Sequence, residues 1–118
     1  MSETTDAVQA QLADLRRKYG RELPGKISRI EAILEPVVAG PWEEQSCSAV
    51  YRQIHSLAGS SGTYGFPEIC GLARSAEVLL KQCLDSRAPL AASEQGQVET
   101  LMATLREMAA DAARPYSP

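Results

Sequence analysis

The chain has 118 residues, the length of a single domain with room for one core. Its composition, 44% hydrophobic and 23% charged, is ordinary for a globular protein and excludes a disordered chain or a fibrous repeat. The net charge of −3 has the sign opposite to what neutralising a phosphate backbone requires, so nucleic acid is not an expected partner.

The cysteines and the first residues of the sequence indicate the cellular compartment. Cys47, Cys70 and Cys83 are odd in number and form no C-x-x-C pair, which fits neither a disulfide framework nor a zinc site. The first residues, MSETTDAVQAQ, lack the pattern of a signal peptide, and no apolar run approaches the ~18 residues needed to span a bilayer. We therefore expect a cytoplasmic monomer without a membrane partner.

Aromatic and β-branched residues are few beside Ala, Leu, Glu, Gln and Arg, which favours an all-α domain. The first expected helix is short and ends near Gly20, a natural stop; its apolar face carries Val8, Leu12, Leu15 and Tyr19. The second begins at Pro24 and ends at Gly40-Pro41, and its apolar face carries Leu23, Ile27, Ile30, Leu34 and Val37.

The third expected helix covers about residues 43–61, and its core positions are Cys47, Val50, Ile54 and Leu57. The fourth begins near Pro67 and carries a wide apolar stripe as far as Cys83. Because only about five residues, 62–66, join them, these two helices should lie antiparallel as neighbours.

A loop near residues 86–91 precedes the fifth helix, whose apolar face carries Val98, Leu101, Met102, Leu105 and Met108, and the chain ends in ARPYSP. We expect an up-and-down antiparallel four-helix bundle with a short additional N-terminal helix. Residues 1–118 would form one domain, with about 112–118 as a flexible tail or the start of a linker.

His55 is the only histidine, and it falls inside the third expected helix. At ~100° per residue it points roughly 120° away from the core direction, so we expect it at the surface. The same sector of the helix carries a mixed set of small, aromatic and basic residues: Ser48, Tyr51, Arg52 and Gly59.

Gly59 lies one turn after His55, and a glycine inside a helix costs ~1 kcal/mol relative to alanine. One interpretation is that the missing side chain gives another molecule access to this surface. The other is a helix end or kink at Gly59, which Gly62 three residues later also allows.

Chemistry narrows the uses of a solitary exposed histidine. A continuous bundle helix offers no cleft in which a base, an orienting group and an oxyanion stabiliser could meet, so we do not expect an enzyme. The cysteines fall on core faces, so we expect no metal site and no cofactor of the chain's own. The remaining use is nucleophilic: an unprotonated imidazole nitrogen can attack a phosphoryl group that a partner brings.

Residues 49–66, AVYRQIHSLAGSSGTYGF, resemble the signature of histidine-containing phosphotransfer (HPt) domains, H-x-[LI]-K-G-[SAG]-[SA]-x-x-[FYL]-G. Seven positions of this acceptor motif, residues 55–65, match the signature: His55, Leu57, Gly59, Ser60, Ser61, Tyr64 and Gly65. The expected helices extend the resemblance over nearly the whole chain.

The resemblance implies a four-helix bundle with His55 as the phosphoacceptor of two-component phosphorelays. In such relays a receiver-domain phosphoaspartate donates its phosphoryl group to the histidine, which passes it to an aspartate of another receiver. The implied partners are receiver domains of response regulators or hybrid histidine kinases. The receiver supplies the Mg²⁺ and most of the transition-state stabilisation.

The sequence departs from the signature at Ala58, where the family commonly carries lysine. The candidates for a replacement cation are Arg52, three residues before His55, and Arg74 and Lys81 on the following helix. A solvated face is the alternative interpretation of Arg74 and Lys81.

Two further functions stay open. The motif is also similar to the acceptor domain of chemotaxis-type histidine kinases, which is phosphorylated by an ATP-binding kinase domain. A non-phosphorylated helical interaction bundle could keep the same fold. The sequence leaves open which kinase and regulator it serves, the direction of phosphoryl flow, and whether the chain stands alone or is a module of a longer protein.

Overall fold

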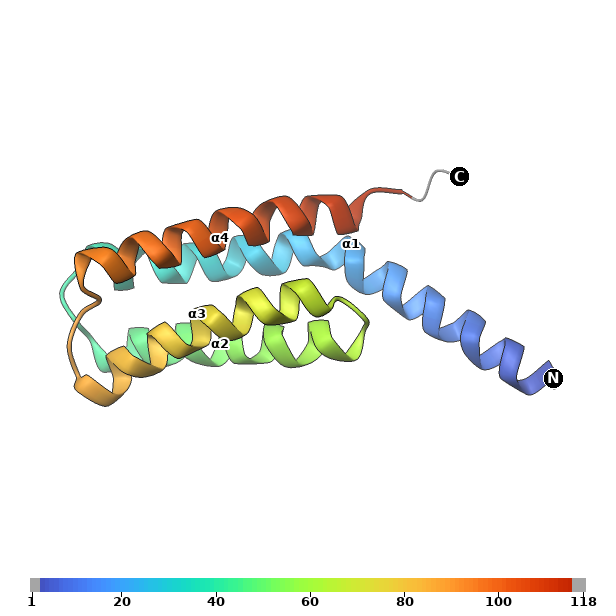
Figure 1. The fold of residues 1–118 in the computed structure, drawn as a ribbon, viewed down its shortest axis with the longest axis horizontal. Coiled ribbons are helices and arrows are strands. Elements are labelled where there is room, and N and C mark those ends of the chain that lie inside the picture. Colours follow the sequence, from blue (N-terminus) through green and yellow to red (C-terminus); the bar gives the residue numbers. More distant parts are fainter. Residues whose placement is uncertain (1–2, 116–118) are drawn as a thin grey trace.

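The computed structural model describes residues 3–115, and these form four helices joined by short links (Figure 1). The helices are α1 (Glu3–Ala39), α2 (Glu44–Thr63), α3 (Pro67–Ser86) and α4 (Ala92–Ala113). Within this range no strand occurs, and the all-α class is confirmed. In Figure 1 each helix runs back along the one before it, so that α2 and α3 lie side by side, as do α1 and α4.

The two separate helices expected before residue 40 were wrong, because α1 passes through Gly20 and Pro24 without a break. Gly20 is a contact point and not a stop: a Cβ there would lie 2.7 Å from the Ala112 carbonyl oxygen, so the missing side chain lets α1 and α4 approach. Pro24 cannot donate to the Gly20 carbonyl and its ring crowds that carbonyl, but the helix continues through it. Figure 1 shows α1 changing direction where it leaves the bundle, as a helix does near proline.

The first turns of α1 project beyond the other three helices (Figure 1). Every residue from 4 to 18 is exposed, whereas Tyr19 is buried at the point where α1 enters the bundle. The apolar face predicted for this segment is therefore present, but no other part of the described chain covers it.

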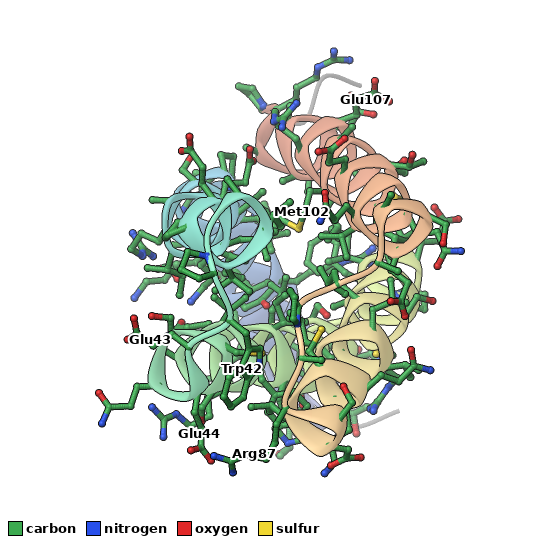
Figure 2. The ribbon with its side chains drawn as sticks, turned by 90° about the vertical axis from the view of Figure 1, so that its left-hand side faces the viewer. Trp42, Glu43, Glu44, Arg87, Met102 and Glu107 are labelled. Atoms are coloured by element: carbon green, nitrogen blue, oxygen red, sulfur yellow. The ribbon has the colours of Figure 1, made fainter. Side chains whose placement is uncertain are left out.

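The core lies between all four helices, and Figure 2, which looks along the bundle, shows Met102 pointing inwards. The four core positions expected on α2, which are Cys47, Val50, Ile54 and Leu57, are buried. The largest fully buried side chains on the other helices are Leu23, Ile27, Leu80, Val98 and Leu105. Burial of this apolar surface is the main force that holds the bundle together.

The link between α2 and α3 is shorter than expected, because α2 continues through Gly62 to Thr63. Only residues 64–66 remain for the turn. Gly65 has φ +86°, in the left-handed region that favours glycine. The Phe66 N–H then donates to the Ser61 carbonyl at 2.8 Å, which closes the end of α2.

At the opposite end the two remaining links contact each other (Figure 2). The Arg87 guanidinium lies 5.3 Å from the centroid of the Trp42 ring and 3.4 Å from a Glu44 carboxylate oxygen. α4 ends at Ala113, whereas we expected a tail from about residue 112, and residues 116–118 of that segment lie outside the described range. None of the described helices is both long and apolar enough to cross a membrane.

Candidate functional site

His55 lies in the middle of α2 with its side chain 64% exposed, on the side of the helix away from buried Ile54 and Leu57. This position agrees with the direction computed from the helical turn. Because α2 continues unbroken to Thr63, the imidazole is held on a rigid, packed helix.

Glu77 of α3 is the partner of His55, and its Oε1 accepts a hydrogen bond from the imidazole Nδ1. The Glu77 side chain is only 14% exposed, so its carboxylate is fixed between the helices. An ionised carboxylate can only accept, so Nδ1 carries the proton and the lone pair of a neutral ring is on Nε2. With this tautomer the exposed Nε2 has a lone pair that is not used inside the fold.

Tyr51 packs beside His55 one turn earlier on α2. Its ring centroid lies 6.1 Å from that of the imidazole, and the two ring planes differ by 23°. Ser48 is half-buried one turn before Tyr51, and Arg52 is exposed. The structure thus places Ser48, Tyr51 and Arg52 on one sector of α2 with His55, as expected.

Gly59 leaves open space one turn after His55. A Cβ built at this position would meet no atom within 4 Å, and the residue is exposed. Since α2 neither ends nor breaks there, the interpretation of Gly59 as a helix end is wrong.

The candidate cations on α3 flank Glu77, one turn to either side. Lys81 Nζ donates to Asp85 Oδ1 at 2.7 Å, and this hydrogen bond, with the Asp85 charge, raises the Lys81 pKa. Arg74 is exposed and makes no ion pair with any described residue. Lys81 is therefore already engaged, whereas the Arg74 guanidinium is available.

Ala58, where the family commonly carries lysine, is not at an exposed position. The Ala58 side chain is 1% exposed and belongs to the core. A cation that acts on His55 must therefore come from another position.

The second half of the acceptor motif has structural contacts. Ser61 is fully buried and donates to the Ala58 carbonyl at 3.2 Å, while Ser60 hydrogen bonds to Tyr19 of α1. The Tyr64 ring stacks on the Tyr19 ring with centroids 4.8 Å apart. These residues fix the end of α2 to α1 rather than contacting the imidazole.

The cysteines do not form a site. Cys47 and Cys83 are buried and Cys70 is half-buried. Burial raises the pKa of Cys83 to about 11 and also raises that of Cys47, so both thiols are protonated at neutral pH. Among the described residues, no group of three or more His, Cys, Asp or Glu side chains could hold a metal ion.

The comparison with protein families decides what kind of histidine site this is. The family model described as Hpt domain matches residues 8–112, most of the chain. The chain belongs to the Hpt domain family. Hpt domains are phosphocarriers rather than enzymes, and this Hpt domain accordingly has a histidine phosphotransfer role in two-component phosphorelays. No curated protein and no solved structure matches the chain.

Sequence reasoning missed Glu77 in this Hpt domain. A signal was available: Arg74, Glu77 and Lys81 follow at intervals of three and four and so share one face of α3. The search for a cation selects Arg74 and Lys81 on this face and passes over the carboxylate between them. Only the pairing of α2 with α3 shows that it faces His55.

Proposed function

We propose that His55 accepts a phosphoryl group on Nε2 from the phosphoaspartate of a receiver domain and passes it to an aspartate of a response regulator. The observation that carries the proposal is the hydrogen bond from His55 Nδ1 to Glu77, because it leaves Nε2 unprotonated on an exposed side chain.

The reaction needs no proton transfer at the attacking nitrogen. The Nε2 lone pair forms the N–P bond while the P–O bond to the donor aspartate breaks, and the aspartate leaves as a carboxylate. The phosphorylated ring keeps its Nδ1 proton and gains positive charge, which the Glu77 carboxylate stabilises. When the phosphoryl group is passed on, a carboxylate oxygen of the acceptor aspartate forms a new P–O bond while the N–P bond breaks, and Nε2 regains its lone pair.

The receiver would dock on the exposed sector of α2 around His55. Open space at Gly59 gives it access to the helix backbone one turn after the imidazole, and Ser48 and Tyr51 extend the surface in the other direction. The receiver would bring the Mg²⁺ that neutralises charge on the transferring group. A cytoplasmic location belongs to the same proposal, and three free thiols support it.

Arg74 is the cation we assign to the phosphoryl group in place of the family's usual lysine. The assignment follows from the pairing of α2 with α3. Two contacts define this pairing. His55 contacts Glu77. The Cβ position of Gly62, seven residues after His55, lies 3.3 Å from the Sγ of Cys70, seven residues before Glu77. Three residues past His55 is Ala58, and three residues before Glu77 is Arg74.

Arg74 therefore lies at the level of Ala58 on the neighbouring helix. Its side chain is exposed and long, and a guanidinium can bind phosphoryl oxygens through two N–H groups at once. Lys81 lies at the other end of the site, near Tyr51, and is held by Asp85. Arg74 is thus the better placed of the two.

The experiment that tests the proposed function is phosphotransfer from receiver domains loaded with a small-molecule phosphodonor. The wild-type chain should gain an acid-labile, base-stable phosphate, and His55→Gln should gain none. Because His55 is exposed, the substitution should change the free energy of unfolding by less than about 0.5 kcal/mol. Phosphate on the His55→Gln chain, or no transfer to the wild type from any receiver, would contradict the proposal.

A parallel reaction with ATP and a chemotaxis-type kinase domain separates the two phosphoacceptor functions. If the kinase domain phosphorylates the chain and receivers do not, the donor is a kinase domain instead of a receiver, and His55 remains the acceptor. Binding to receivers without any transfer would identify the non-phosphorylated interaction bundle instead.

A further inference from the structure

The projecting part of α1 carries an apolar stripe that the described chain leaves uncovered. Val8, Leu12 and Leu15 are 47%, 59% and 46% exposed, and three of the five large hydrophobic residues that are exposed in the described range belong to this segment. We call these three residues the N-terminal stripe.

The N-terminal stripe continues the core-facing side of α1. The intervals from Val8 to Leu12, Leu15 and Tyr19 are four, three and four residues, the spacing of a coiled-coil seam. Tyr19 is the first of these to be buried, against the end of α2. A helix laid along the stripe would therefore extend the bundle core by about two turns.

The charges along α1 indicate which partner helix would lie along the N-terminal stripe. Residues 1–15 carry three carboxylates, Glu3, Asp6 and Asp14, and no lysine or arginine. Residues 16–18 are Arg16, Arg17 and Lys18. One of the cations, Arg17, pairs with Asp14 of its own helix, which leaves an acidic beginning and a basic end. Such a helix is complementary to an antiparallel copy of itself.

A cleft at the basic end adds to this complementarity. It lies between α1 and the α2–α3 turn, and its walls include Leu12, Arg16, Tyr64 and Phe66. The Arg16 guanidinium lies over the Phe66 ring, 5.2 Å from its centroid, and makes no ion pair with a described carboxylate. The acidic end of an antiparallel helix would reach this cleft.

We propose that the N-terminal stripe binds the same stripe of a second copy of the chain, with the two helices antiparallel about a two-fold axis near Leu12. This replaces the monomer expected from the sequence. The contact is small, so the dimer is weak and forms with rising concentration. His55 lies more than two turns of α2 away from the α2–α3 link, so both phosphoacceptor surfaces stay open in the dimer.

Sedimentation velocity of the full chain, from micromolar to millimolar concentration, tests the dimer. Leu12→Glu should remain monomeric throughout. Ala10→Glu is the matched control, because it adds the same charge to the opposite face of the same exposed segment. The control should dimerise with a dissociation constant within a few-fold of the wild-type value, and both variants should keep wild-type helicity. A monomeric wild type, or equal effects of the two substitutions, would overturn the proposal.

Cysteine crosslinking in a Cys70→Ser background tests the antiparallel arrangement. Gln11→Cys, near the axis, should crosslink to itself. Thr4→Cys should not do so, but it should crosslink to Lys18→Cys when the two chains are mixed. High salt should weaken the dimer, because charge complementarity contributes to it. Self-crosslinking of Thr4→Cys would show a parallel pair and overturn the proposal.

Discussion

Tyr19 Oη and Ser60 Oγ lie 2.6 Å apart, so a hydrogen bond joins α1 to the residue that directly follows Gly59 in α2. Ser60 thus uses its side chain inside the fold, while its neighbour Gly59 faces open space. Two adjacent positions of the acceptor motif serve different purposes, and substitutions can separate the stability of the bundle from phosphotransfer.

Tyr19→Phe should lower the free energy of unfolding by about 1 kcal/mol, because it removes one partly buried hydrogen bond and keeps the aromatic packing. Phosphoryl acceptance by the folded protein should not change. Urea unfolding and a transfer assay on the same preparation measure both. A slower transfer at unchanged stability would place Tyr19 in the transfer machinery.

Glu77→Gln should slow phosphoryl acceptance by roughly ten-fold, because a charge-assisted hydrogen bond becomes a neutral one and the charged phosphorylated ring loses its counter-ion. Glu77→Asp should recover part of the rate. The ¹⁵N shifts of the imidazole report the tautomer directly: the wild type should carry its proton on Nδ1, and Glu77→Ala should lose this preference. A wild-type ring protonated mainly on Nε2 would contradict the assigned role.

Gly59→Gln should slow transfer to and from receivers, because the new side chain would fill the open space next to His55. It should raise the free energy of unfolding by up to about 0.5–1 kcal/mol, since glycine is a poor helix former. Gly96→Gln is the matched control: Gly96 is also an open, exposed helical glycine, but on α4. Equal transfer rates for the two variants would show that Gly59 has no role in docking the receiver.

Arg74→Ala should shorten the lifetime of the phosphorylated state or slow its formation by a few-fold, because a screened surface charge contributes only ~0.2–1 kcal/mol. The deficit should grow at low ionic strength, and Arg74→Lys should restore part of the function. Arg52→Ala and Lys81→Ala are the comparison variants, and a larger effect of either would move the role to that residue.

Stability should fall at alkaline pH partly because of Cys83. Burial raises its pKa from 9.0 to about 11, so the unfolded chain loses this proton first. The resulting contribution to stability is fully present below pH 9.0 and disappears as the pH rises towards about 11. In urea unfolding, the free energy of unfolding should differ less between pH 8 and about pH 10.5 for Cys83→Ala than for the wild type. Equal differences would show that Cys83 does not contribute.

Helical periodicity was sufficient to predict the features that depend on one helix at a time. The buried side of α2 and the exposure of His55 both follow from the angle between residues, and both agree with the structure. The helix breaks expected at Gly20 and Pro24 do not occur, because the local conformational preferences of glycine and proline take no account of contacts with the rest of the bundle. Contact with Ala112 of α4, which is distant in sequence, explains the glycine.

Features that depend on how two helices align could not be predicted in this way. Glu77 is 22 residues from His55, and a shift of α3 by one residue would turn a different side chain towards the imidazole. The burial of Ala58 is different, because Ala58 lies one turn after buried Ile54 and so follows from the periodicity of α2 alone.

The division within the acceptor motif has an evolutionary consequence. Ser61 and Gly65 have roles in folding that do not depend on His55: Ser61 is a small buried residue that donates to the Ala58 carbonyl, and Gly65 adopts a positive φ angle. A descendant that lost phosphotransfer would therefore retain these two residues under selection for folding and would still score well against the motif. From the roles proposed for His55, Gly59 and Glu77, we expect divergence in signalling to appear first at positions 55, 59 and 77, and these positions should separate active from silent relatives better than the whole motif does.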